Sequence, residues 1–354
     1  MQQLLWFVLG CGITLLSVPA LIPITRRLGL VDIPGGRRCH VSPTPKAGGL
    51  ALVAAILGVG VVAGTVTGKD LPTGLLAGSL ILVLLGLWDD SRPISAIWRL
   101  SGQTLAGFCM TRFDHLQLEG FGNLLGTGAI ELGMFAEVVT VFAVVGGINC
   151  INMLDGMNGL SGSVALIVVA GLLIIVGAGA ADIALPGFLL AGSLVGFLCY
   201  NHPALRGGRS LVFLGEAGSN LLGFWLAWLL VAAAGQPEAS FPPVTAVWLM
   251  LVPLADTLCL MLRRALEGRS PFSADREHVH HLLLRRLGSE QAVVWWLSGM
   301  SLGGALAAFG TAQSWWSEPL AFYAFLVVLA GHTWRSSRRI MRDRTQRTGL
   351  SREA

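Results

Sequence analysis

Charge is scarce in this sequence. Lysine and arginine together number 24 and aspartate and glutamate 20, so only 12% of the 354 residues are charged, whereas 54% are hydrophobic. A soluble domain typically has about 25% charged residues, so this composition excludes an ordinary soluble enzyme. Apolar runs of about 20 residues, the length of a transmembrane helix, recur along the chain. These runs are continuous rather than alternating, which excludes a β-barrel and predicts an all-α polytopic membrane protein.

Paired cysteines, internal repeats and low-complexity segments are also missing. The cysteines occur singly and mostly in apolar runs, at positions 11, 39, 109, 150, 199 and 259. Without a CxxC pair they predict small buried side chains rather than disulfides or a zinc site. The first ten residues have no basic segment and no clear cleavage site, so we expect a first membrane helix rather than a removed signal peptide.

The apolar runs predict about eleven transmembrane helices. They cover roughly residues 3–25, 48–66, 72–88, 94–113, 132–152, 162–180, 184–200, 218–235, 243–262, 292–312 and 317–334. With the N-terminus outside and the C-terminus inside, every basic residue except Lys69 and Arg112 falls on the inner side, as the positive-inside rule requires. We therefore expect a membrane domain over residues 1–335 and a basic cytoplasmic tail over 336–354, attracted to anionic lipid.

A polar cluster interrupts two apolar runs near the middle of the chain. Its members recur at every third residue and are Asn149, Asn152, Asp155 and Asn158. An aspartate at the centre of a membrane helix costs about 2.5–3.5 kcal/mol, so such a cluster is expected at an interface, a water-filled cavity or a reaction site. Gly156 and Gly159 predict that the helix ends near Asp155. The alternative is a polar helix end with asparagine caps.

Other polar stretches also fall on the predicted inner side. Residues 32–49 combine Arg37, Arg38 and Lys46 with prolines and glycines, which suits either phosphate binding or ordinary inside charge. Asp89 and Asp90 adjoin each other, and this pair favours either Mg²⁺ or capping of the next helix.

Residues 201–220 place Glu216 between glycines at the start of a predicted helix. There backbone N–H groups could hold an anion and Glu216 could reach a metal, or Glu216 could simply complement the helix dipole.

A histidine tract follows in residues 273–286, which predict an amphipathic interfacial helix. On a regular helix His278 and His281 share one face and His280 points away, so a three-histidine zinc site fits poorly. A solvated helix and a site for a phosphorylated or aromatic ligand group are the alternatives. Asp256 lies in an apolar run, and we expect it to be paired with an arginine or asparagine as a supporting residue.

These motifs, taken in order, resemble the polyprenyl-phosphate N-acetylhexosamine-1-phosphate transferases, the glycosyltransferase 4 family. The matching pieces are Asp32-x-Pro-x-x-Arg-x-x-His40 with Pro43-x-Pro-x-x-Gly-Gly49, Asp89-Asp90, Asn149-x-x-Asn152-x-x-Asp155-Gly156, Gly215-x-x-Gly218-Ser219 and His278-x-His280-His281. The resemblance covers residues 1–335, and the first and last motifs favour the WecA-type branch. Asn158 and Glu216 depart from the aspartates usual in the family.

The resemblance implies transfer of a sugar-1-phosphate from a UDP-N-acetylhexosamine to undecaprenyl phosphate, releasing UMP and starting a lipid-linked, O-antigen-like polysaccharide. It implies a bacterial inner (plasma) membrane protein with a cytoplasmic active site, Mg²⁺ or Mn²⁺ as cofactor, contact with membrane lipid, no nucleic-acid partner, and homodimerisation as an open alternative. The implied catalytic residues are Asp89, Asp90 and Asp155, and the implied metal ligands are Asp155 and Glu216. The implied substrate-binding residues are Lys46, Asn149, Asn152, Asn158, Arg206, Arg276, His278, His280 and His281.

Competing functions remain open at this stage. A lipid I synthase-type phospho-MurNAc-pentapeptide transferase belongs to the same family. A secondary transporter would also place carboxylates in a helical bundle, although often near the midplane of the membrane. An intramembrane aspartyl protease would need two aspartates at mid-membrane depth.

Overall fold

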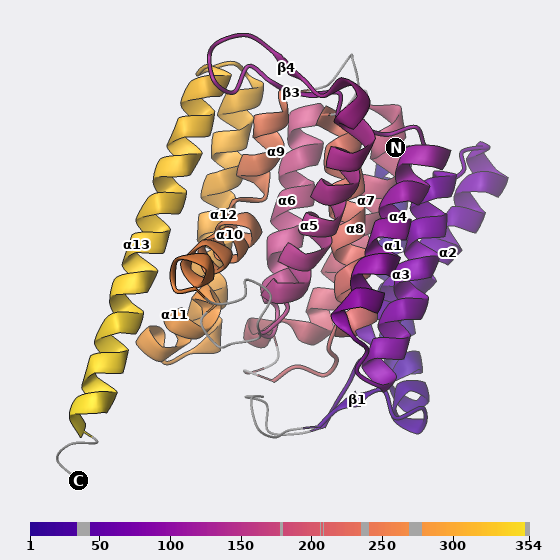
Figure 1. The fold of residues 1–354 in the computed structure, drawn as a ribbon. Coiled ribbons are helices and arrows are strands. Elements are labelled where there is room, and N and C mark those ends of the chain that lie inside the picture. Colours follow the sequence, from indigo (N-terminus) through magenta and orange to yellow (C-terminus); the bar gives the residue numbers. More distant parts are fainter. Residues whose placement is uncertain are drawn as a thin grey trace.

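The computed structural model describes residues 1–33, 43–177, 180–205, 207, 209–234, 241–268 and 278–350, with side chains described as far as Arg335 except for Ala181. Within these ranges the chain is predominantly helical with only two short strand pairs, which agrees with the predicted all-α membrane class (Figure 1). The helices are α1 (Gln2–Arg27), α2 (Gly48–Thr67), α3 (Thr73–Ser91), α4 (Ala96–Phe113), α5 (Ala136–Leu154), α6 (Leu160–Val176), α7 (Ala181–Asn201), α8 (Gly215–Ala234), α9 (Pro243–Leu249), α10 (Leu251–Leu266), α11 (Val279–Leu287), α12 (Glu290–Ala312) and α13 (Glu318–Leu350).

Each of the eleven predicted membrane ranges overlaps one of these helices or, for 243–262, the pair α9 and α10. Seven helices are long and apolar enough to span a membrane: α1, α2, α3, α5 with the turn before it, α7, α8 and α12. The pair α9 and α10 bends by 85° at Met250 and makes an eighth span if counted as one. The shorter α6, together with α4 and α13, does not pass this test, so eleven spans remain a prediction.

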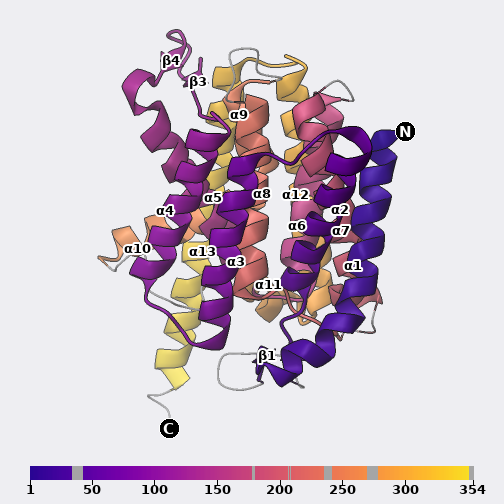
Figure 2. The same ribbon diagram turned by 90° about the vertical axis from the view of Figure 1, so that its right-hand side faces the viewer.

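Helix α8 forms the centre of the bundle (Figure 2). Nearly all of its side chains are buried, and α2, α3 and α5 pack against it. Glycines make this close packing possible: a Cβ added to Gly49 would lie 2.5 Å from Gly218, and one added to Gly223 would lie 2.6 Å from Ile148. Membrane helices commonly associate through such small residues, because the hydrophobic effect does not drive helices together inside lipid and close packing must hold them.

The two ends of the bundle differ in their loops. In Figure 1 the N-terminus lies at the top, and β1, α11 and the described end of α13 lie at the bottom. At the bottom, β1 (Val31–Asp32) pairs antiparallel with β2 (Thr44–Pro45). At the top, the predicted long outer loop contains the hairpin of β3 (Gly120–Gly122) and β4 (Ile130–Glu131). The N-terminus and the polar loops at β1 and α11 therefore lie at opposite ends of the bundle, as expected. Which end faces the cytoplasm stays a prediction.

The structure can also be compared with the expectations for the cysteines and for the end of the membrane domain. The five cysteines within the described residues are free thiols, as their isolated positions predicted, and Cys39 lies outside those residues. Helix α13 continues to Leu350 and therefore has no break at the boundary expected near residue 335.

Candidate active site

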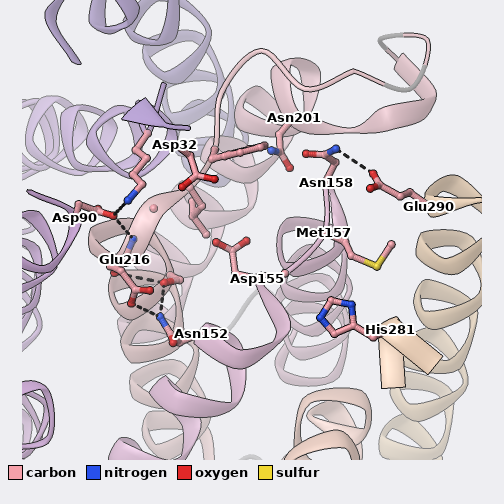
Figure 3. Close-up of a pocket in the computed structure, with 16 residues that line it drawn as sticks. Asp32, Asp90, Asn152, Asp155, Met157, Asn158, Asn201, Glu216, His281 and Glu290 are labelled. Carbon is pink, nitrogen blue, oxygen red and sulfur yellow. Dashed lines mark hydrogen bonds and ion pairs between the residues drawn. The ribbon is translucent and has the colours of Figure 1, made fainter. Parts of the chain in front are cut away.

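A cavity of about 340 Å³ opens at the lower end of the bundle, where loops from distant parts of the sequence meet (Figure 3). Its walls come from β1, the end of α3, the α5–α6 loop, the start of α8, and α11 with α12. The polar and charged residues that line it are Asp32, Lys46, Asp90, Asn152, Asp155, Asn158, Asn201, Glu216, Ser219, His281 and Glu290. The cavity is therefore lined by residues whose positions in the sequence are up to more than 250 residues apart.

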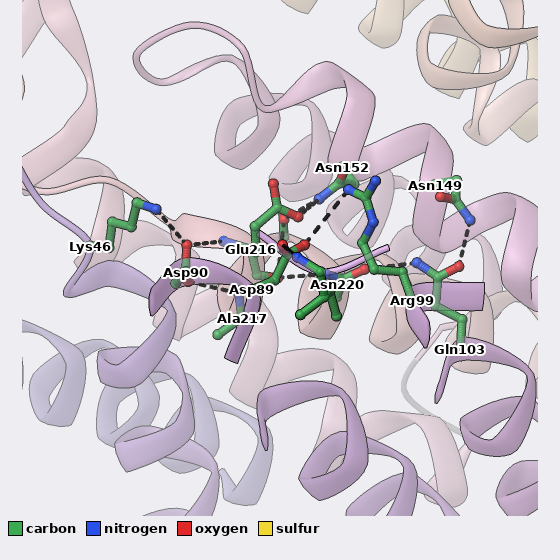
Figure 4. Close-up of polar contacts among 12 residues, drawn as sticks. Lys46, Asp89, Asp90, Arg99, Gln103, Asn149, Asn152, Glu216, Ala217 and Asn220 are labelled. Carbon is green, nitrogen blue, oxygen red and sulfur yellow. Dashed lines mark hydrogen bonds and ion pairs between the residues drawn. The ribbon is translucent and has the colours of Figure 1, made fainter. Parts of the chain in front are cut away.

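Asp90 joins three of these segments. Its carboxylate accepts hydrogen bonds from the backbone N–H groups of Glu216 (3.1 Å) and Ala217 (3.2 Å) at the start of α8, and it pairs with Lys46 Nζ at 2.8 Å (Figure 4). Gly215 has φ +74°, and a Cβ there would lie 2.8 Å from Asp90 Oδ2, so this turn requires glycine. The anion site expected at this helix start is therefore occupied by Asp90 itself.

Asp89 has a different role from its neighbour. Its Oδ1 accepts from the backbone N–H of Ile94 at 3.0 Å, just before α4, and its Oδ2 lies 3.7 Å from Arg99 Nη1. It does not line the cavity. The predicted capping of the next helix therefore applies in part to Asp89, which stabilises the turn into α4, whereas Asp90 caps the distant helix α8.

Asn152 positions Glu216 by direct hydrogen bonding. Its Nδ2 donates to Glu216 Oε2 at 2.7 Å and to Ser219 Oγ at 2.8 Å. Glu216 lies in the first turn of α8, so α5 and α8 together fix the direction of this carboxylate towards the cavity.

A chain of amides, of which Gln103 and Asn220 are buried and Asn149 is half-buried, lies behind Glu216. Asn149 Nδ2 donates to Gln103 Oε1 at 2.7 Å, Gln103 Nε2 donates to Asn220 Oδ1 at 3.0 Å, and Asn220 Nδ2 donates to the Glu216 carbonyl at 2.7 Å (Figure 4). Asn149 does not line the cavity, so its geometry supports the backbone at Glu216 rather than a direct substrate contact. Sequence reasoning missed Gln103, although a glutamine inside an apolar run is a signal of its own.

Asp155 lies where α5 ends, as Gly156 and Gly159 predicted. It follows the last helical residue, and Ser161 Oγ donates to its Oδ1 at 2.5 Å. Burial raises the pKa of Asp155 to about 7; the Ser161 hydrogen bond opposes this shift, and the nearby charges of Glu216 and Asp90 add to it. A bound cation would relieve this cost by stabilising the ionised carboxylate.

Amides and one carboxylate form the remaining wall. Asn158 Nδ2 donates to Glu290 Oε2 at 3.0 Å. Asn201 accepts from the Gly159 N–H at 2.6 Å through Oδ1, and its Nδ2 donates to the Val212 carbonyl at 2.8 Å. Asn201 therefore holds the α5–α6 loop against the segment that leads into α8.

The histidine tract corrects two expectations. Helix α11 begins only at Val279, so His278 precedes it and its ring stacks on that of His280, with 5.6 Å between centroids and 13° between planes. The expected divergence of these two rings is therefore wrong, because it assumed a regular helix through His278. Asp256 pairs with His278 Nδ1 at 3.0 Å and accepts from the Val279 N–H at 2.7 Å, so its partner is a histidine rather than an arginine or asparagine.

The three histidines also differ in exposure to the cavity. His281 lines it, whereas His278 and His280 do not. His280 is buried against Gly156, where a Cβ would lie 2.6 Å from Nε2. Burial lowers the pKa of His280 to about 3; the nearby charge of Asp256 opposes this shift, and His281 and His278 add to it, so the ring is neutral.

The other candidates divide into two groups. Arg206 and Arg276 lie outside the described residues, as do Arg37, Arg38 and His40. Sequence reasoning did not select Asp32, Asn201, Ser219 or Glu290, which line the cavity. The first three stand in motifs already noted, whereas Glu290 in the first turn of α12 carries no local signal.

The donor set fits magnesium better than zinc. No cluster of three or more His, Cys, Asp or Glu side chains suited to a metal occurs in the part of the chain that the structure describes. Mg²⁺ commonly uses one or two carboxylates and completes its shell with water and substrate phosphates. Asp155 and Glu216 face one cavity and interact electrostatically, which matches this requirement.

Comparison with known proteins gives the family. The model described as glycosyl transferase family 4 matches residues 72–234. The undecaprenyl-phosphate alpha-N-acetylglucosaminyl 1-phosphate transferase of Yersinia pestis is 33% identical over 326 residues, covering 89% of this chain and 88% of the relative. The protein of that name from Escherichia coli strain K12 is 35% identical over 274 residues (77% and 74%), and that of Haemophilus influenzae 31% over 344 residues (94% and 95%). This chain therefore belongs to glycosyl transferase family 4 and is a glycosyl-1-phosphate transferase.

Proposed function

We propose that this protein transfers N-acetylglucosamine 1-phosphate from UDP-N-acetylglucosamine to undecaprenyl phosphate and releases UMP. The observation that carries the proposal is the single cavity in which Asp90, Asp155, Glu216 and Lys46 converge from separate segments. Relatives named for the same acceptor and the same sugar support it.

The reaction exchanges one phosphoanhydride for another. An oxygen of the acceptor phosphate attacks the phosphorus that carries the sugar, the bond from that phosphorus to the UMP oxygen breaks, and UMP leaves with the bonding electrons. A phosphate monoester has a second pKa of about 6, so the acceptor is mostly dianionic at pH 7 and needs little help from a general base. The main work of the protein is to neutralise two anions and align them.

The residues divide this work between them. Asp155 and Glu216 would hold Mg²⁺ (Mn²⁺ being the alternative), and Asn152 would keep Glu216 aligned. Bound Mg²⁺ supplies charge neutralisation at the phosphate oxygens. Lys46, paired with Asp90, lines the cavity and would attract a phosphate there. His281 contributes a polar wall from α11.

The membrane setting gives each substrate its own route. We place the cavity at the cytoplasmic face of the bacterial inner membrane, because UDP-sugars are made in the cytoplasm. The nucleotide would enter from the cytoplasm and the polyprenyl chain sideways from the bilayer. The product would then start a lipid-linked envelope polysaccharide.

A donor panel tests this function against the alternatives. Purified protein in detergent receives undecaprenyl phosphate, Mg²⁺ and one of several donors, including UDP-N-acetylglucosamine, UDP-N-acetylgalactosamine and UDP-MurNAc-pentapeptide. Mass spectrometry is expected to show the polyprenyl diphosphate of N-acetylglucosamine together with UMP. Product from the pentapeptide donor alone would assign the lipid I synthase reaction instead. No lipid product from any donor would refute the proposed pair of donor and acceptor.

A further inference from the structure

Asp256 is a buried carboxylate to which the proposed reaction gives no role. It lies in α10 between the buried residues Ala255 and Thr257, and only 4% of it is exposed. Each of its oxygens has a hydrogen-bond partner: Oδ2 lies 3.0 Å from His278 Nδ1, and Oδ1 accepts from the Val279 N–H at 2.7 Å. Both partners stand at the start of α11, so one side chain of α10 fixes the first turn of a helix that borders the cavity.

Stability alone does not account for a polar pair at this place. The side chains of Asp256 and His278 are 5% and 13% exposed, and removing such groups from water costs about as much as their mutual attraction returns. Well-packed apolar residues of the same volume commonly hold two segments equally well. A carboxylate beside an imidazole has a further effect: it accepts the proton-bearing Nδ1, leaves Nε2 unprotonated and sets the angle of the ring.

The oriented ring is connected to the cavity through its neighbours. The ring of His278 stacks on that of His280, whose centroid lies 4.3 Å from that of His281. His280 is 1% exposed and packs where Gly156 has no side chain. Gly156 directly follows Asp155, and both Asp155 and His281 line the cavity (Figure 3). Because these groups are in close contact, a shift of the first ring would displace the loop that carries Asp155.

We propose that Asp256 is a positioning residue for the transfer: it orients the rings of His278 and His280, and these hold the loop that carries Asp155. This inference rests on the proposed function. Asp256 acts only through other residues, since it does not line the cavity. The geometry matters because a displacement of about 1 Å at a reacting group can cost about 100-fold in rate.

Two substitutions separate ring orientation from capping of α11. Asparagine keeps an oxygen for the Val279 N–H, but its amide would donate to His278 Nδ1 and impose the opposite tautomer, whereas alanine loses both bonds. In Asp256→Asn and Asp256→Ala we expect kcat/KM with UDP-N-acetylglucosamine to fall about 10- to 100-fold and the Mg²⁺ concentration at half-maximal rate to rise about 10-fold. A fraction of unfolded protein would lower the rate but would leave this Mg²⁺ concentration unchanged.

A double variant tests the path through the ring. His278→Ala should lower kcat/KM to a similar extent. Adding Asp256→Ala to it should cost less than about threefold more, because both changes break one connection.

Hydrogen exchange measures the anchoring of α11 without any substrate. In Asp256→Ala the amides in the first turn of α11 should exchange about 2- to 30-fold faster, the factor for losing a capping carboxylate. In Asp256→Asn they should stay within about twofold of wild type, because asparagine caps about as well as aspartate. Asp256→Asn, which keeps the shape of the side chain, also serves if Asp256→Ala does not fold.

Thr333→Val is the matched structural control. Thr333 is buried on α13 and donates to Cys259 Sγ on α10 at 3.0 Å, so the variant removes a hydrogen bond from the same helix while both bonds of Asp256 remain. We expect it to leave transfer, the Mg²⁺ concentration and the exchange of α11 unchanged.

Three results would overturn the inference: Asp256 variants that transfer like Thr333→Val, fully multiplied losses in the double variant, or unchanged exchange of α11 in Asp256→Ala. A wild-type protein without transfer refutes the proposed function instead, and the exchange of α11 then still decides whether Asp256 anchors that helix.

Discussion

Replacing Asp90 by alanine is expected to destabilise the fold more than replacing its neighbour Asp89. The Asp90 side chain is 2% exposed and bonds two backbone N–H groups of α8 as well as Lys46, which is itself only 16% exposed. Asp89 bonds one N–H group and has a longer, 3.7 Å contact with the more exposed Arg99. The two substitutions are chemically identical and adjacent in sequence, so each serves as the control for the other.

The geometry sets the size of the difference. Breaking a buried ion pair from one side costs about 3–5 kcal/mol, because the remaining charge loses its partner. Losing a single capping carboxylate costs about 0.5–2 kcal/mol, and the exposed contact of Asp89 with Arg99 adds little. With an unfolding entropy of about 2.1 cal/mol/K for each of 354 residues, Asp90→Ala should lower Tm by roughly 4–7 °C and Asp89→Ala by roughly 1–3 °C.

Thermal unfolding in detergent measures both variants. Tryptophan fluorescence is a suitable signal, since the chain has 11 tryptophans. A double variant with Lys46→Met should lose less than the sum of the two single losses, because Asp90 and Lys46 share one interaction. If Asp90→Ala melts within about 1 °C of wild type, or if Asp89→Ala is the less stable of the two, then Asp90 does not join α3, β2 and α8 as described.

Four further outcomes are expected. Asp155→Asn should abolish transfer while Tm stays within about 2 °C of wild type, and normal turnover in that variant would remove Asp155 from the chemistry. EDTA should stop transfer and added Mg²⁺ should restore it; activity that persists in EDTA would dismiss the metal. Excess UMP added to isotopically labelled lipid product should regenerate labelled UDP-sugar, since one phosphoanhydride replaces another, and label that never returns would contradict direct exchange. Gln103→Leu should reduce transfer roughly 10–100-fold, as loss of outer support for a ligand commonly does, whereas unaltered kinetics would show that the amide chain does not position Glu216.

The sequence predicted the helices better than their relation to the membrane. Continuous apolar runs locate each helix because twenty apolar residues have few other stable arrangements in lipid. The hydrophobic runs alone do not reveal that the range 243–262 bends by 85° at Met250, but Pro253 is a local signal for this break, because a proline has no N–H to bond the carbonyl of Leu249. Periodicity predicted one span here because it records which residues are apolar and not where a backbone hydrogen bond is missing.

Local motifs predicted which polar residues gather but not what each one contacts. Asp90, Asp155 and Glu216 face one cavity as expected, since each ends or begins a helix at the same side of the bundle. The partner of Asp90 was not predictable, because the N–H groups that it caps lie 126 residues further along the chain. Glu290 was missed for the same reason, because its hydrogen-bond partner Asn158 is 132 residues away in the sequence.

The burial of α8 restricts how this enzyme can move during turnover. Gly49 and Gly223 bring neighbouring backbones against α8 so closely that not even a methyl group fits between them. A helix clamped in this way cannot slide or rotate without displacing three others, so Glu216 stays fixed while substrates come and go. We therefore expect any adjustment of the cavity during turnover at the opposite wall, where the short helix α11 and the start of α12 border the same cavity.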